Sequence, residues 1–116
     1  LPLLAKSDAG AVVFAIDDLA RGDSSAGTNG AFWGGYGLAQ SAQETLVSML
    51  QAELGVHGPR ISGLRPGPMR TALRARAFQP NTDLKAAPAA EYASACVALL
   101  SASGGAQRGK IVDVAA

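Results

Sequence analysis

The sequence is short of cysteine, of aromatic side chains and of net charge. Its 116 residues include one cysteine and 5% aromatics, and ten Lys plus Arg stand against nine Asp plus Glu. A single Cys96 excludes an internal disulfide framework and a multi-cysteine zinc site, and it suits a reducing cytoplasm. The net charge of +1 argues against a nucleic-acid-binding tail or a polybasic membrane anchor. We therefore expect a cytoplasmic protein without nucleic-acid, membrane or metal partners.

Long apolar runs are also missing. No stretch approaches the roughly 20 apolar residues that a membrane span needs, and residues 1–4 are too short for a signal peptide. What is present is 48% hydrophobic residues, enough for one modest core and too many for a disordered chain. We expect a single domain over residues 1–116. Because the chain starts at Leu1 without methionine, we interpret it as part of a longer protein.

Three segments have the composition of strands. The run 10–16 is continuously apolar and rich in β-branched and aromatic residues, which is typical of a strand buried on both faces. Shorter extended runs lie at 60–65 and 110–114. Between the first strand and the next helix, residues 18–35 are small and polar, which indicates a long loop.

Helices are predicted between these strands. The strongest covers 36–54 and ends at Gly55, because its apolar residues recur at a spacing near 3.6. Those residues are Ala39, Ala42, Leu46, Leu50 and Leu54. A second helix is expected at 89–101, with Pro88 at its first position and an apolar face that includes Cys96, Val97, Leu99 and Leu100. A short, exposed helix is expected at 69–78.

The order of these elements predicts the fold class. Connections of about a dozen residues or more between strands favour parallel pairing with right-handed crossovers. The expected fold is therefore a three-layer α/β unit of about three parallel strands with flanking helices. This is half of a doubly wound sheet, and it leaves one strand edge for a partner to cover.

Four runs of residues carry a family resemblance, and they lie at 12–15, 33–36, 64–71 and 108–113. They resemble the C-terminal half of a short-chain dehydrogenase/reductase, and the resemblance spans nearly the whole chain. It implies a Rossmann-type parallel sheet, NAD or NADP as cofactor, and a small carbonyl or alcohol substrate. It also implies that helix 36–54 packs against its copy in another subunit of a homo-oligomer.

The resemblance identifies Tyr36 as the catalytic residue and Pro66, Gly67 and Thr71 as contacts of the nicotinamide end of the cofactor. Gln40 lies one helical turn after the tyrosine, at the position where the family has lysine. Its amide can still form a hydrogen bond with a ribose hydroxyl. A phenol has a pKa near 10 and needs a nearby positive charge to act at neutral pH, which an amide does not provide. We therefore expect the general acid to be disabled.

Two further departures concern the serine and the phosphate loop. Asp17 follows the first strand, where the family usually has serine, and an ionised carboxylate repels a developing oxyanion. Ser24 and Ser25 come closer to the family's spacing. No glycine-rich turn has the context of a phosphate loop. We expect this chain to be inactive alone, with the absence of any cofactor as the alternative to NAD or NADP, unless it pairs with a missing N-terminal half.

Two functions remain open. One is a part of an NAD(P)-dependent oxidoreductase, and the other is a non-catalytic α/β association module in which the cofactor machinery has decayed. A local basic cluster is interpreted as a solvated face, because no aromatic residues are interleaved for base stacking. It consists of Arg60, Arg65, Arg70, Arg74 and Arg76. His57 has no second ligand candidate, so no metal site is expected.

Overall fold

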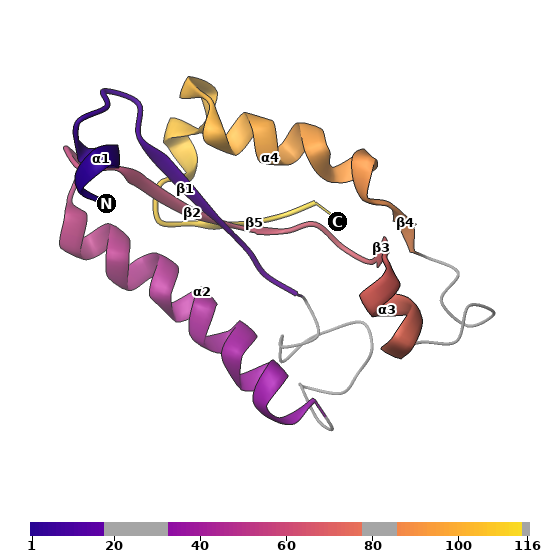
Figure 1. Ribbon diagram of the computed structural model, residues 1–116. Coiled ribbons are helices and arrows are strands. Elements are labelled where there is room, and N and C mark those ends of the chain that lie inside the picture. The colour runs from indigo at the N-terminus through magenta and orange to yellow at the C-terminus, as the bar shows by residue number, and fades with distance from the viewer. Residues whose placement is uncertain (18–32, 78–85, 115–116) are drawn as a thin grey trace.

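The computed structural model describes residues 1–17, 33–77 and 86–114 (Figure 1). Its centre is a three-stranded parallel sheet in the order β1-β2-β5, formed by β1 (Ala11–Ala15), β2 (Arg60–Arg65) and β5 (Ile111–Asp113). Helix α2 (Gly34–Leu54) lies on one face of this sheet and α4 (Ala93–Leu100) on the other (Figure 1). The predicted three-layer α/β architecture is thus confirmed.

The strand register brings distant parts of the chain together. Ala11 of β1 pairs with Arg60 of β2, and Gly63 of β2 pairs with Ile111 of β5. All residues of β2 are buried, whereas β1, the strand predicted to be buried on both faces, is only half-buried. The prediction was wrong on this point because, among the described residues, β1 pairs on one side only.

The core lies between the sheet and α2. Ile16, Val47 and Ile61 are almost fully buried and form its centre. Gly63 lets these side chains meet, because a Cβ there would lie 3.0 Å from Ile111 Cγ1 and 3.1 Å from Ile16 Cδ1. The sheet and helix can therefore approach closely at this point.

Helix α2 confirms the predicted helix, but much of the predicted apolar stripe is exposed. It begins at Gly34 rather than at residue 36, and its buried residues are Gly37 and Val47. Ala39, Ala42 and Leu46, which belong to the predicted apolar stripe, are exposed. Polar residues of α2, Gln40 and Glu44, instead bind the ends of the strands.

The segment after β2 differs from its prediction. Residues 69–78 were expected to form one helix, but the chain forms a short strand, β3 (Met69–Arg70), before α3 (Ala72–Ala77). Strand β3 pairs in parallel with β4 (Ala87–Pro88). Pro88 therefore lies in a strand and not at the first position of a helix, and its ψ of 140° is extended.

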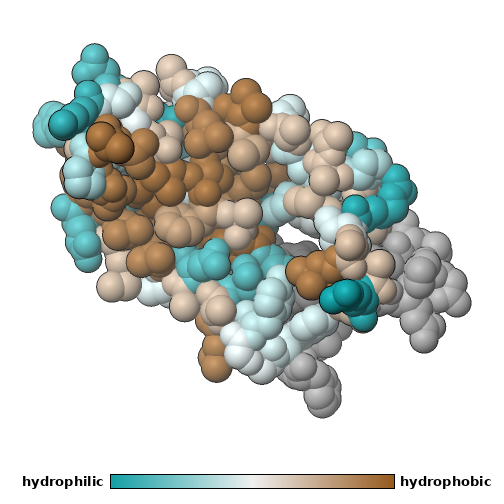
Figure 2. Space-filling view, viewed as in Figure 1, coloured by the Kyte–Doolittle hydropathy of each residue, from teal (hydrophilic) through white to brown (hydrophobic). Residues whose placement is uncertain are grey.

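The second predicted helix is shorter than expected. A 3₁₀ turn, η2 (Ala89–Tyr92), precedes α4. Of the expected apolar face, Leu99 is buried, but Val97 is 64% and Leu100 47% exposed. On the face shown in Figure 2, apolar side chains gather over β1 and the neighbouring α4. The single apolar face predicted for this helix is thus only partly covered.

The remaining elements lie at the chain ends and after α4. They are α1 (Pro2–Ala5) and the 3₁₀ turn η3 (Ala102–Gln107). The expected strand 110–114 is confirmed as β5. In the described part of the chain, no helix is long and apolar enough to cross a membrane.

Candidate active site

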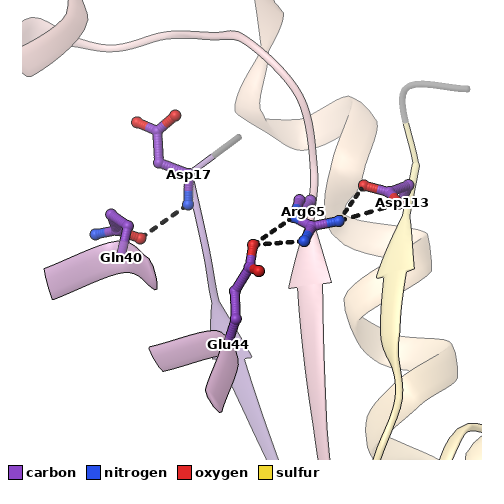
Figure 3. A network of polar contacts seen from close by, with 5 residues as sticks. All are labelled: Asp17, Gln40, Glu44, Arg65 and Asp113. Atoms are coloured by element: carbon purple, nitrogen blue, oxygen red, sulfur yellow. Dashed lines mark hydrogen bonds and ion pairs between the residues drawn. The ribbon is translucent and has the colours of Figure 1, made fainter. Parts of the chain in front are cut away.

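The candidate site lies at the carboxyl ends of the three parallel strands. Asp17 follows β1, Arg65 is the last residue of β2, and Asp113 is the last residue of β5. In open α/β sheets this is the edge at which ligands bind. The polar side chains of α2 reach the same edge, so that the chemistry-bearing residues of four elements gather there (Figure 3).

Tyr36 and Gln40 both hold Asp17. The Tyr36 hydroxyl donates a hydrogen bond to Asp17 Oδ2 at 2.7 Å, and the Asp17 backbone N–H donates one to Gln40 Oε1 at 2.9 Å. Residues one helical turn apart share a face, which brings both side chains to the end of β1. The carboxylate therefore stands against the phenol of Tyr36.

This environment keeps the proton on Tyr36. Burial, the hydrogen bond to Asp17 and the charge of Asp17 raise the pKa of Tyr36 to about 12, while the charge of Arg74 acts in the opposite direction. A neutral phenol is favoured because both the loss of water and a nearby carboxylate penalise the phenolate. At neutral pH, Tyr36 is a hydrogen-bond donor.

A cavity of about 390 Å³ adjoins this pair. The sequence-predicted site residues Tyr36, Gln40, Pro66, Gly67 and Thr71 all line it. Gly67 has a φ of 98°, a left-handed backbone conformation that side-chain-bearing residues rarely adopt. Thr71 Oγ1 accepts a hydrogen bond from the Arg74 N–H at 3.1 Å and so caps α3.

A second polar group joins α2 to the ends of β2 and β5. Arg65 donates to Glu44 Oε1 from Nε at 2.9 Å and also from Nη2, and its Nη1 donates to Asp113 Oδ1 at 3.1 Å (Figure 3). Burial lowers the pKa of Arg65, but the hydrogen bonds to both carboxylates more than offset this and raise the pKa above its ordinary value. The arginine therefore stays charged within this cluster.

The structure separates the basic cluster noted in the sequence. Arg60 and Arg65 are buried, and Arg60 Nη2 donates to the carbonyl oxygens of Leu99 and Ser101 at 2.8 and 2.6 Å. Arg74 lines the cavity. The interpretation as a solvated face was wrong for Arg60 and Arg65, which are buried and have hydrogen-bond partners inside the fold. Arg74 is half-buried, and Arg70 and Arg76 are exposed.

Sequence reasoning missed Glu44, Arg65 and Asp113 as parts of one cluster. Glu44 lies two helical turns after Tyr36 on the same helix face as Gln40. This spacing could have predicted that Glu44 reaches the same end of the sheet. Ser24 and Ser25 lie outside the described residues. Within residues 1–17, 33–77 and 86–114, no group of three or more histidine, cysteine and acidic side chains could hold a metal ion.

Parallel strands that end around such a cavity, with flanking helices on both faces, define an α/β fold of the Rossmann type. A short chain dehydrogenase from Salmonella enterica serovar Typhi matches 100% of this chain with a TM-score of 0.85 and 29% identity. A short chain dehydrogenase from Shigella flexneri 2a, solved in complex with NADP, matches 98% of it with a TM-score of 0.83 and 31% identity. By this likeness of fold and sequence the chain belongs to the short-chain dehydrogenase/reductase family.

Sequence similarity points to the same family. The uncharacterized oxidoreductase YciK of Escherichia coli K12 is 42% identical over 79 residues, which are 67% of this chain and 28% of YciK. No protein-family model matches the chain. The chain spans about 45% of the length of the two solved structures above.

Proposed function

We propose that this chain forms the nicotinamide and substrate end of the active site of an NAD(P)-dependent carbonyl/alcohol oxidoreductase. The observation that carries this proposal is that Tyr36, Gln40, Pro66, Gly67 and Thr71 line one cavity. The Shigella structure in complex with NADP, and one from Escherichia coli CFT073 in complex with NADPH, support a nicotinamide cofactor.

The residues present fit such a cofactor. Gly67, without a side chain and with positive φ, lets a ligand approach the backbone after β2, and the Gln40 amide offers a donor for a ribose hydroxyl. When bound, a reduced nicotinamide supplies a hydride. Thr71 and Pro66 line the same cavity.

Tyr36 is the proposed proton donor to the substrate carbonyl oxygen. Its pKa of about 12 means that the phenol carries its proton at neutral pH. Reduction of a carbonyl needs such a donor, whereas oxidation of an alcohol needs a base to accept the hydroxyl proton. Because burial together with the hydrogen bond and charge of Asp17 raises the pKa of Tyr36 and so weakens the phenol as an acid, we propose that Tyr36 must leave Asp17 before it can donate to the substrate.

Cofactor binding is the direct test. Trp33 lines the cavity, and its ring centroid lies 6.2 Å from that of Tyr36, so its fluorescence should change when NADPH or NADH binds. The variant Ala15→Leu fills part of the cavity and should weaken binding at least several-fold. The matched control is Ala72→Leu, the same change at an exposed position outside the cavity lining.

No change in Trp33 fluorescence at millimolar cofactor would refute the cofactor role of this chain. In that case the non-catalytic association module becomes the better description. A comparison of NADPH with NADH in the same experiment decides between the two cofactors.

We also propose that the chain self-associates through the outer face of α2. Leu38 is 75%, Met49 53% and Leu46 38% exposed on this helix. A second copy would cover these apolar side chains and remove their surface from water, which favours association.

A further inference from the structure

The turn that follows β2 is held at its first residue by contacts with two other elements. Pro66 and Gly67 of this turn line the cavity. Just before them, the Arg65 side chain is bound by Glu44 of α2 and by Asp113 of β5 (Figure 3). A proline stands on each side of the glycine, and each proline ring fixes its own φ. The chain therefore enters the cavity wall from a fixed point and with little freedom.

The other end of the turn is held at the carbonyl oxygen of Pro68. This oxygen accepts two hydrogen bonds, one from the Ala87 N–H at 3.0 Å and one from the Tyr92 hydroxyl at 2.9 Å. Ala87 begins β4 and Tyr92 ends η2, so both donors come from the part of the chain that follows α3. The chain thus leaves the turn at Pro68 and later returns to the same carbonyl.

The segment between these two points forms part of the cavity wall. Thr71, Leu73 and Ala77 belong to it and line the cavity. Figure 1 shows β3, α3 and β4 together at one end of the molecule. The pairing of β3 with β4 spans only two residues of each strand, so the hydroxyl of the half-buried Tyr92 adds a side-chain attachment to a short backbone one.

We propose that Tyr92 is a positioning residue for the cofactor site. Its hydroxyl acts through the Pro68 carbonyl and holds Gly67 and Thr71 where they meet the nicotinamide end of the cofactor. This inference rests on the proposed function of the cavity. A site whose backbone is already ordered binds more tightly, because less conformational freedom is lost when the ligand arrives.

Tyr92→Phe tests the proposal, because it removes the hydroxyl and keeps the ring. The probe is NADPH or NADH, whichever the wild type binds more tightly, and Trp33 fluorescence gives its dissociation constant well below the unfolding temperature of each chain. We expect Tyr92→Phe to bind the probe roughly three- to tenfold more weakly than the wild type. A purely structural role would lower the unfolding temperature and leave this constant unchanged.

Ser48→Ala is the matched control. It removes a hydroxyl that also donates to a backbone carbonyl at 2.9 Å, that of Thr45, at an exposed position of α2 outside the cavity lining. This variant should bind the probe as tightly as the wild type does.

Exchange of the backbone amides of residues 69–71 gives a second readout. In the wild type these residues are held before the cofactor arrives, whereas in Tyr92→Phe the cofactor must order them. A saturating concentration of the probe should therefore slow their exchange more in Tyr92→Phe than in the wild type.

The other outcomes separate this inference from the proposed function. An unchanged dissociation constant in Tyr92→Phe overturns the inference and leaves the cofactor site standing. Equal losses of affinity in Tyr92→Phe and Ser48→Ala also overturn it, and so does weaker binding with equal slowing of exchange in variant and wild type. Failure of the wild type to bind either cofactor refutes both proposals.

Discussion

The proton of Tyr36 is held by burial and by Asp17, against the opposing charge of Arg74. Asp17 accepts that proton in a 2.7 Å hydrogen bond, and Gln40 holds the Asp17 backbone in place. Each of these residues stands where the family resemblance implies a different one, a serine and a lysine. Because serine donates and lysine carries positive charge, the two replacements act in the same direction and stabilise the neutral phenol.

The variant Asp17→Asn tests this account. It removes the carboxylate charge and the strongest acceptor, so the pKa of Tyr36 should fall from about 12 toward its ordinary value of 10.0, with burial keeping it somewhat above. The ionisation is followed by the ultraviolet absorbance of tyrosinate, with Tyr36→Phe to identify the signal. An unchanged transition in Asp17→Asn would show that burial alone sets the pKa.

The same shift predicts a dependence of stability on pH. The folded state holds the Tyr36 proton more tightly than the unfolded state, whose pKa is near 10.0. The contribution of this raised pKa to the free energy of unfolding is therefore fully present below about pH 10 and is lost as the pH rises toward 12. Denaturant titrations of the wild type and Tyr36→Phe should show a smaller loss of stability over this interval in the variant.

Helix α2 shows what a hydrophobic pattern can and cannot predict. The spacing of apolar residues predicted the helix, and Gly55 its end, but the buried side of the helix includes polar residues that the pattern does not reveal. Gln51 is one of them, because its Oε1 accepts the Ile61 N–H at 2.8 Å and its Nε2 donates to the Gly55 carbonyl at 3.0 Å. Polar residues point inward here since strand ends offer unpaired backbone and charged groups.

Arg65 joins three elements, and its loss should be costly. The Arg65 side chain is only 10% exposed. Arg65→Met therefore leaves the carboxylates of Glu44 and Asp113 without the cation that they share. Breaking a buried charged pair in this way costs about 3–5 kcal/mol, and the exposure of Asp113 favours the lower end. We expect a reduction of about 3 kcal/mol in the free energy of unfolding, measured by chemical denaturation.

Glu44→Gln is the comparison for this experiment. It keeps the shape of the side chain and leaves Arg65 paired with Asp113, so it should cost clearly less than Arg65→Met. Equal losses in the two variants would mean that Glu44 alone supplies the stabilisation.

Gly63 sets how closely α2 and β5 meet the central strand. In Gly63→Ala the new methyl group would lie 3.0 Å from Ile111 and 3.1 Å from Ile16, so the core must shift. Overpacking of this kind costs about 1–3 kcal/mol. Gly105→Ala is the control, because a Cβ there meets nothing within 4 Å. In thermal denaturation, the midpoint temperature of Gly63→Ala should lie well below that of the wild type, and that of Gly105→Ala close to it.

The molecule as a whole exposes apolar side chains on its helices. If the outer face of α2 binds a second copy, Leu38→Glu should dissociate it, because a charge cannot be buried there without a partner. Sedimentation at micromolar concentration gives the association state, and Ala75→Glu on the exposed side of α3 serves as control. A wild-type chain that sediments as a monomer would contradict self-association through α2.

At this scale the sequence predicted the architecture well and the site partly. Three parallel strands with helices on both faces follow from the order of patterned segments, and Tyr36 with residues 66–71 follows from family resemblance. The short β3–β4 pairing could not be predicted, because two-residue strands carry no periodicity. The role of Arg65 was hidden as well, since its two carboxylate partners lie far from it in the sequence.

The strand register has a consequence for how fast the chain folds. Ala11 pairs with Arg60 and Gly63 with Ile111, so each strand pairing in the central sheet closes a loop of roughly fifty residues. In the part of the chain that the structure describes, no hairpin offers a short first step, and such high contact order slows folding. We expect β2, which takes part in both closures, to be structured in the folding transition state. Ile61→Val should then slow refolding, whereas Leu99→Ala in α4 should mainly accelerate unfolding.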